Sequence, residues 1–290
     1  MGPTDMPLKE ADDRYIIFDN HMHLNPKGRF LDAVDMFLKA GGDTFNLVNL
    51  PDNSLGNDLY YETLYERTVS MSRIIREEKE FDLPVTLGPY PLDYFRIKET
   101  GKDPIEEMKR AIDLACRYIS EGEANAIGEI GRPHFPVPEE ILDASNSIIL
   151  YAMERAAELH CPVILHTDDL NEEGYRLLER MAEHAGLDRE MVVKHHAMSQ
   201  DLSIETQIRR SLLASKSNAR IASLSGKPFL LETDYVDDPA LGWKVIPPDS
   251  VPRRAIMLKS GPGNWEAVFS QAFRTIPIEL FGEDKFKAFL

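Results

Sequence analysis

Residues 15–23, YIIFDNHMH, indicate the fold, because an apolar run ends there in two histidines. The run Tyr15–Asn20 has the length and composition of a buried strand. Successive strand side chains point to opposite faces, so His21 and His23 share one face with Asp19. Two imidazoles on one face of a strand, roughly 6–7 Å apart at the backbone, can bind one metal ion.

Four further metal-type residues occupy the same kind of position in the chain. Each closes a short apolar run and precedes a turn or a polar stretch: Glu129 in AIGEIG, His166 in VILHT, His195 in VVKHH and Asp234 in FLLETD. Imidazole and carboxylate are the side chains that bind Zn²⁺ and similar divalent ions. Residues this far apart along the chain meet only if their strands converge, and in a closed parallel barrel all strands end at one face.

Short apolar runs alternate along the chain with longer helical patterns, which is typical of consecutive βα units. We expect eight strands, near residues 15–20, 44–49, 84–88, 124–129, 162–166, 191–195, 207–213 and 228–233. We expect helices near residues 30–40, 59–80, 104–120, 139–159, 172–185 and 218–224, another from Trp265, and a short one at the C-terminus. The predicted fold class is α/β, a TIM (β/α)8 barrel with a metal site at the C-terminal ends of the strands.

The length and composition agree with one barrel. The chain has 290 residues, 43% of them hydrophobic, and such barrels run to about 250 residues as one domain. We expect a single domain over residues 1–290, with residues 1–13 as a polar N-terminal tail. No apolar stretch approaches the roughly 20 residues of a membrane span, so no membrane partner is expected. Cys116 and Cys161 lie in apolar surroundings, which predicts reduced, buried thiols in a cytoplasmic protein.

The formal net charge is −16, from 49 acidic and 33 basic residues. This charge argues against a protein that wraps nucleic acid, because broad nucleic-acid binding uses a basic surface. Bound cations and a few arginines can still make a site locally positive for a strand end or a small phosphoester. The cations that we expect at the mouth as substrate-binding residues are Arg132, Lys194, Arg253 and Arg254, with surface charge or a salt bridge as the alternative for each.

Other polar residues near the strand ends are candidates for supporting roles. His134, in GRPHFPV after the fourth strand, is expected to touch substrate, or else lies on a surface loop. Asp19 and Glu232 lie one layer deeper on the inward faces, where they either orient the ligands or hydrogen-bond within the barrel wall. Adjacent strand residues face opposite ways, so His195 and His196 compete for one position. We prefer His195, because Met191 and Val193 continue its inward face.

The order HxH, Glu, His, His, Asp at successive strand ends resembles the amidohydrolase superfamily of metal-dependent hydrolases. Within that superfamily, GEIG (128–131) and LETD (231–234) are similar to the TatD family of metal-dependent DNases, as are FDNHMHL (18–24), NWEAVF (264–269) and IELFG (278–282). The resemblance covers nearly the whole chain. It implies that the metal-binding residues are His21, His23, Glu129, His166, His195 and Asp234, and that Asp234 is also the catalytic acid/base.

The chain departs from the family pattern beside two of these positions. It has Arg132-Pro133-His134 where members usually carry Leu-Asp-Tyr, and His196-Ala197 where they usually carry Cys-Phe. These departures leave the metal-binding residues intact and change the walls around the substrate. They indicate a divergent, archaeal-type branch of the family.

The ligand set also predicts the cofactor and the reaction. Glu129 can bridge two ions and take part in catalysis, because a carboxylate offers two oxygens on opposite sides. His21, His23 and Asp234 are then expected to hold one ion, and His166 and His195 the other. Four imidazoles and two carboxylates favour Zn²⁺, with Mn²⁺, Co²⁺ or Mg²⁺ as alternatives.

We therefore expect a metal-activated water to cleave phosphodiester bonds, as in a DNase or a 3′–5′ exonuclease. The expected substrate is a single-stranded DNA end or a small phosphoester. One alternative is a hydrolase of lactones, phosphotriesters or C–N bonds, because fold and metal site do not fix substrate. Another is a non-catalytic metal-binding protein, against which Asp234 argues as an intact acid/base candidate.

Overall fold

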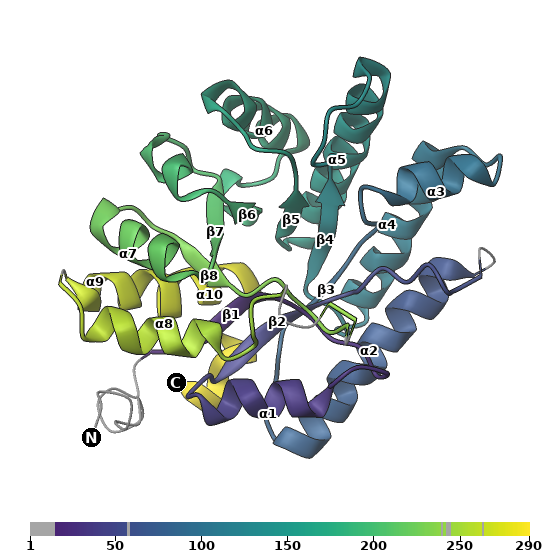
Figure 1. The fold of residues 1–290 in the computed structure, drawn as a ribbon. Helices are drawn as coiled ribbons and strands as arrows, with labels where there is room; N and C mark the ends of the chain where they lie inside the picture. The colour runs from purple at the N-terminus through teal and green to yellow at the C-terminus, as the bar shows by residue number, and fades with distance from the viewer. Residues whose placement is uncertain (1–14, 57–58, 239, 242–244, 263) are drawn as a thin grey trace.

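The predicted TIM barrel is confirmed by a computed structural model, which describes residues 15–56, 59–238, 240–241, 245–262 and 264–290. The expected tail at residues 1–13 lies outside the described residues. The described residues form nine strand segments, all paired in parallel. Figure 1 shows the strands at the centre of the molecule with helices around them. They are β1 (Phe18–His23), β2 (Thr44–Val48), β3 (Val85–Leu87), β4 (Ala126–Gly131), β5 (Val163–His166), β6 (Val192–Ala197), β7 (Arg209–Leu213), β8 (Leu230–Glu232) and β9 (Tyr235–Val236).

The eighth barrel strand is split into β8 and β9, which explains nine segments where eight strands were expected. β8 pairs with β7, and β9 pairs with β1 on the other side. Between them, the backbone N–H of Thr233 donates to Asp19 Oδ1, and that of Asp234 donates to the His21 carbonyl. The split strand therefore joins the first and last parts of the chain and closes the barrel.

The predicted helices are present, and several begin and end where local capping chemistry sets the limits. For α6 (Glu172–Ala185), the side chain of Asn171 accepts from Gly174 N, and Gly186 ends the helix in the left-handed conformation. The other helices expected between strands are α1 (Leu31–Lys39), α2 (Tyr60–Lys79), α4 (Pro104–Ser120), α5 (Glu139–Leu159) and α7 (Lys216–Ser225).

Two α-helices in the described part of the chain were not predicted. They are α3 (Asp93–Glu99), between β3 and α4, and α8 (Ser250–Lys259), after β9. The C-terminal part that follows consists of α9 (Trp265–Ser270), the π-helical η5 (Gln271–Thr275), α10 (Ile276–Phe281) and the 3-10 helix η6 (Glu283–Phe289). Short 3-10 helices η2 (Arg189–Met191) and η3 (Ser199–Ser203) flank β6.

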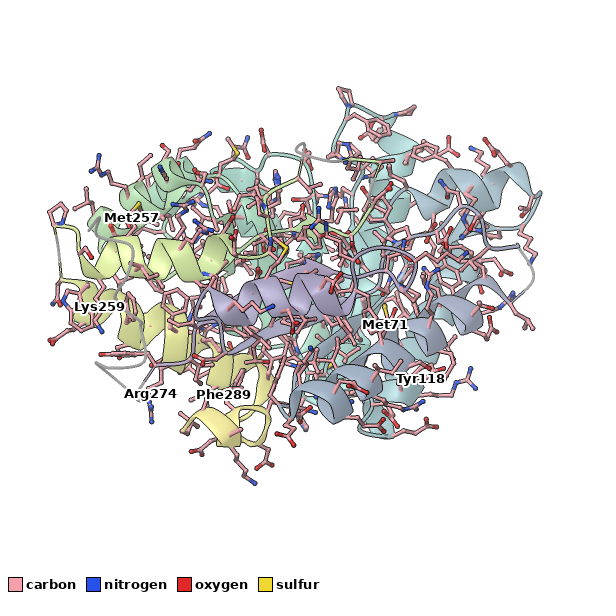
Figure 2. The ribbon with its side chains drawn as sticks, turned by 60° about the horizontal axis from the view of Figure 1, so that its bottom comes forward. Met71, Tyr118, Met257, Lys259, Arg274 and Phe289 are labelled. Atoms are coloured by element: carbon pink, nitrogen blue, oxygen red, sulfur yellow. The ribbon has the colours of Figure 1, made fainter. Side chains whose placement is uncertain are left out.

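The C-terminal segment plugs the end of the barrel at which the strands begin. Phe18, the first residue of β1, lies 5.7 Å from the ring of Phe281 and 5.6 Å from that of Phe286, between ring centroids. Ala126 and Leu230, the first residues of β4 and β8, belong to the same buried apolar cluster. Figure 2, in which Phe289 is labelled, shows this segment from another side. This end of the barrel therefore holds a packed apolar cluster, and His21 and His23 lie near the opposite end of β1.

The helices and the two cysteines bear on two further expectations from the sequence. Among the described residues, no helix combines the length and the apolar character needed to cross a membrane. Cys116 and Cys161 are both buried and free, as expected for reduced thiols.

Candidate metal centre

All six residues predicted as metal ligands meet at the C-terminal ends of the strands. Two sets offer ligand atoms that lie within 4.8 Å of one another: His21, Glu129 and His195 form the first, and His21, His23 and Asp234 form the second. His166 lies beside the first set. We call these six residues the ligand cluster.

Glu129 is the centre of the ligand cluster, because four imidazoles approach its carboxylate. Its Oε2 lies 2.7 Å from His195 Nε2, 3.1 Å from His166 Nδ1 and 3.8 Å from His21 Nε2. Its Oε1 lies 3.8 Å from His23 Nε2. The two oxygens therefore face different imidazoles, and each can act as a ligand atom.

The second set is completed by Asp234 at the break between β8 and β9. Its Oδ1 lies 3.5 Å from His23 Nε2 and 4.0 Å from His21 Nε2, and those two nitrogens are 3.2 Å apart. Asp234 has a left-handed backbone with φ of 48°. Some 27% of the Asp234 side chain is exposed, against 6% for Glu129, so Asp234 is the carboxylate of the cluster that solvent reaches.

The GEIG motif places Glu129 by letting β4 approach β5 closely. At Gly131, with φ of 146°, a Cβ atom would lie 1.8 Å from the carbonyl oxygen of His166. At Gly128 a Cβ atom would lie 2.7 Å from the carbonyl oxygen of Ile164. A side chain at either position would push the strands apart, so these glycines bring Glu129 and His166 within contact distance.

Hydrogen bonds behind the ligands fix their ring orientations. His195 Nδ1 lies 3.3 Å from Glu232 Oε1, which also accepts from the backbone N–H of His196 at 2.6 Å. His23 Nδ1 lies 3.2 Å from the Val48 carbonyl, to which it donates, so that Nε2 faces the cluster. Glu232 thus contacts a ligand directly, as one of the two predicted arrangements required.

Asp19 has the other predicted arrangement, a hydrogen-bonding role within the barrel wall. Its carboxylate accepts from His21 N at 3.1 Å, Thr233 N at 3.0 Å and Thr233 Oγ1 at 2.7 Å. Burial raises the pKa of Asp19 to about 8, although these hydrogen bonds oppose the rise. Asp19 therefore holds β1 to the turn that carries Asp234 and supports the ligands through the backbone.

The buried charges of the ligand cluster shift pKa values in opposite directions. Burial would raise the pKa of Glu129, but His195 and His166 hold it well below its usual range. Burial would lower the pKa of His195, but Glu129 and Glu232 raise it to about 10. Burial, with His195 and His23 nearby, lowers the pKa of His21 to about 3. The carboxylates therefore favour a positive charge at this site. Without metal, the imidazolium of His195 supplies that charge, and a bound metal ion would take its place.

Three of the four cations predicted at the mouth pair with other groups of the protein. The prediction that Lys194 lies at the mouth is wrong: the residue is 2% exposed, and its Nζ donates to the carbonyls of Thr167 and His195. It neighbours His195 on β6 and so faces away from the cluster, which strand alternation requires. Arg253 and Arg254 lie on α8, where Arg253 Nη2 pairs with Asp249 at 2.7 Å and Arg254 Nε donates to the carbonyl of Ala214 at 3.0 Å.

Arg132 directly follows β4 and differs from the other predicted cations. Its Nε donates to Asn146 Oδ1 at 2.8 Å, whereas its buried Nη2 has no hydrogen-bond partner in the described part of the chain. Burial lowers the pKa of Arg132, and Asp168 opposes this effect. One nitrogen of the guanidinium is therefore available to hydrogen-bond a ligand.

The structure brings His134 to the cluster and leaves His196 outside it. His134 Nδ1 lies 3.1 Å from His166 Nε2, on the side of the His166 ring away from Glu129. His196 has a left-handed backbone and an exposed side chain, so His195 alone of the pair joins the cluster. Sequence reasoning missed Tyr90, whose ring packs edge-on against His166 at 5.2 Å between centroids. Its place just after the third strand was the available signal.

Comparison with known proteins agrees with this fold and site. Residues 18–282 match the model of a family described as TatD-related DNase. An uncharacterized protein of Methanocaldococcus jannaschii is 33% identical over 249 residues, which cover 83% of this chain and 87% of that protein.

Two solved structures share the fold at low sequence identity. A TatD homolog from Escherichia coli K12 aligns with a TM-score of 0.59 and 15% identity, over 93% of this chain and 99% of that one. An organophosphorus hydrolase variant from Deinococcus radiodurans aligns with a TM-score of 0.55 and 14% identity, over 92% of this chain and 93% of that one.

The barrel and its buried His/Glu/Asp cluster define a class of protein, the (β/α)8 barrels of the amidohydrolase type with a site suited to divalent metal. Within that class, the chain belongs to the TatD-related DNase family.

Proposed function

We propose that the protein is a metal-dependent phosphodiesterase of the DNase or 3′–5′ exonuclease type. Its substrate would be a single-stranded DNA end or a small phosphoester. The observation that carries the proposal is the convergence of four imidazoles on the Glu129 carboxylate, beside a second, solvent-reached carboxylate on Asp234. Membership of the TatD-related DNase family supports the same reaction.

The residues present fit a pair of divalent ions. His21, His23 and Asp234 would hold one ion, His166 and His195 would hold the other, and Glu129 would be a ligand to both. Imidazole-rich sites of this kind suit Zn²⁺, with Mn²⁺, Co²⁺ or Mg²⁺ as alternatives. Such ions, when bound, polarise a phosphoryl oxygen and lower the pKa of a coordinated water.

Asp234 is suited to move the proton in this reaction. Burial would raise its pKa, but the hydrogen bond with His23 and the nearby histidines lower it to about 2, so the carboxylate is ionised at neutral pH. It can accept a proton from the attacking water and deliver it to the leaving oxygen. A bond forms between the water oxygen and phosphorus, the P–O ester bond breaks, and the products are a phosphomonoester and an alcohol.

Arg132 is the cation that we assign to the phosphate. Its Nη2 has no partner within the described residues, and a planar guanidinium matches the oxygens of a phosphoryl group. His134, two residues after Arg132, contacts His166 of the ligand cluster and is the second residue that we assign to substrate binding.

The test is a comparison of substrates and variants. Protein loaded with Zn²⁺ or Mn²⁺ is assayed against a single-stranded oligonucleotide, a chromogenic phosphodiester and a lactone. We expect turnover of the two phosphodiesters, and its loss in Asp234→Asn and in the double variant His21→Ala with His23→Ala. Full activity of the double variant would contradict the proposal.

A second candidate is the hydrolysis of neutral esters, such as lactones or phosphotriesters, or of C–N bonds. The observation that favours it is the formal net charge of −16, which repels polyanionic substrates and leaves neutral ones unaffected. Turnover of the lactone alone in the same panel would favour this candidate. A protein that only binds metal would turn over none of the three, and the solvent-reached Asp234 argues against it.

A further inference from the structure

An aromatic line runs from the protein surface to the ligand cluster. The ring of Phe95, on α3, stacks on that of Phe135, with centroids 6.0 Å apart and planes inclined by 27°. Phe135 contacts His134 at 5.5 Å, and His134 contacts His166 at 5.3 Å, between ring centroids. Figure 1 shows α3 on the side of the barrel that carries β4 and α5. Phe135 lies in the chain segment that joins β4 to α5.

Phe135 is held at the surface instead of being buried. It is 42% exposed, and it is the one aromatic ring among the large hydrophobic residues found exposed in the described part of the chain. Pro133 and Pro136 flank the pair His134-Phe135 and restrict the backbone on both sides. Phe95 stacks against this ring. An exposed, supported ring in a stiff loop is a preformed surface for another flat ring.

The chemistry of a strand end makes a nucleobase the occupant that fits this surface. Nucleic-acid binders usually gain affinity from phosphate contacts with a basic surface, and a chain of net charge −16 has little of that. Stacking of bases on aromatic side chains supplies affinity without charge and with little sequence preference. A phosphate at the ligand cluster would leave its nucleoside close to the aromatic line that leads out from His166.

We propose that Phe135, supported by Phe95, is the stacking platform for the base of the nucleotide whose phosphate lies at the ligand cluster. This inference rests on the proposed phosphodiesterase function, and it names the substrate class as single-stranded nucleic acid with a base at its end. Phe135 is then a specificity-determining residue, and it positions the substrate without taking part in bond cleavage.

The test uses two oligonucleotides that differ only in their 3′-terminal residue, which is either a normal nucleotide or an abasic one. In the full-length, metal-loaded protein, Phe135→Leu keeps an apolar side chain and removes the ring. We expect KM for the normal strand to rise about tenfold with kcat unchanged, because stacking acts on bound substrate and transition state alike. The abasic strand should be cleaved equally by both proteins, and Phe135→Trp should keep the preference for the normal strand.

Two controls separate stacking from damage to the fold. Leu224 on α7 is also exposed and apolar, and Leu224→Ala should change neither KM nor the melting temperature. Because Phe135 is at the surface, Phe135→Leu should also keep the wild-type melting temperature. Equal KM values of the wild-type protein for the two strands, or an equal loss for both in Phe135→Leu, would overturn the platform.

A binding measurement keeps this test independent of catalysis. Fluorescence anisotropy of the labelled strands with Asp234→Asn measures affinity without cleavage, and we expect about tenfold tighter binding of the normal strand, lost on adding Phe135→Leu. Tighter binding of the normal strand, with no cleavage by the wild-type protein, would contradict the phosphodiesterase function and support the stacking platform. Cleavage by the wild-type protein, with equal binding of the two strands, would support the phosphodiesterase function and contradict the platform. The same pair made in RNA identifies the sugar, and the preference in either pair supports the platform.

Discussion

The two ends of the barrel are built from the same strands and have opposite chemistry. β1 begins with Phe18, packed against Phe281 and Phe286, and ends with His21 and His23 in the ligand cluster. The starting end is closed by apolar contacts, which stabilise the fold through burial. The far end buries charged groups, and burying charge costs free energy unless partners or metals compensate. Stability and chemistry are therefore separated along β1, as is usual for this fold.

The largest effect should follow from removing the charge at the centre of the cluster. Glu129→Gln keeps the size of the side chain and takes the negative charge away from four imidazoles. We expect hydrolysis to fall by at least about 10³-fold, since bound metal contributes several kcal/mol to the transition state. Elemental analysis should find that bound metal falls as well. Glu205→Gln, at a surface residue paired with Lys227, is the matched control, and wild-type metal content in Glu129→Gln would contradict this account.

A comparable change in free energy should appear at the other end with no effect on the site. Phe286→Ala removes a fully buried ring that packs on Phe18, and should lower the free energy of unfolding by about 3–5 kcal/mol. Urea denaturation measures this change. The folded variant should bind as much metal per chain as the wild-type protein does. If the variant is fully folded and still binds less metal, the two ends of the barrel are not independent.

A smaller effect is expected one layer behind the ligands. Glu232→Gln removes the charge that faces His195 Nδ1 and keeps an oxygen for the N–H of His196. Metal affinity should fall about 10–100-fold, the usual range for the loss of a partner behind a metal-binding histidine. Calorimetric titration with Zn²⁺ measures it. Unchanged affinity would mean that Glu232 only supports the backbone of β6.

The smallest expected effect is the change in metal affinity per pH unit. Glu129 and Glu232 raise the pKa of His195 to about 10, so at pH 7 a metal must displace its proton. We expect affinity to rise about tenfold per pH unit for each proton released, and to level off above about pH 10. Titration in buffers of different ionisation enthalpy counts the protons, and a count of zero at pH 7 would contradict the assignment.

The same shift has a consequence for stability without metal. The folded pKa of His195 lies above its unfolded value of 6.5, so the imidazolium stabilises the fold fully below about pH 6.5. That contribution is lost as pH rises from 6.5 to about 10. The free energy of unfolding of the metal-free protein should therefore fall between pH 6.5 and about pH 10. Over the same range the affinity of the protein for metal should rise.

Local signals were sufficient for much of the fold. The sequence predicted helices at 139–159 and 172–185, and the structure has them at Glu139–Leu159 and Glu172–Ala185. Caps such as Asn171 and Gly186 act within one turn of chain, so they are readable from sequence. Helix α3 was missed because it is short and is fixed by a distant contact, in which Tyr61 Oη donates to Asp93 at 3.0 Å. The break at Asp234 was missed for the same reason, because it depends on Asp19.

The site was predictable where strand ends determine it and unpredictable where loops do. His21, Glu129, His195 and the other predicted ligands meet because parallel strands end at one face. Lys194 was misplaced although strand alternation beside His195 already excluded it from the mouth. Phe135 was missed because its partner Phe95 lies on a helix that the sequence did not predict. No spacing rule brings together a loop residue and a helix residue that follow different strands.

The most direct test of the central claim is anomalous diffraction from crystals grown with Zn²⁺, recorded at the zinc absorption edge. This account predicts anomalous density at the ligand cluster, within about 2.0–2.2 Å of Glu129 and of the imidazole nitrogens that face it. Crystals without such density at the cluster, in which Glu129 still contacts His195 directly, would contradict it.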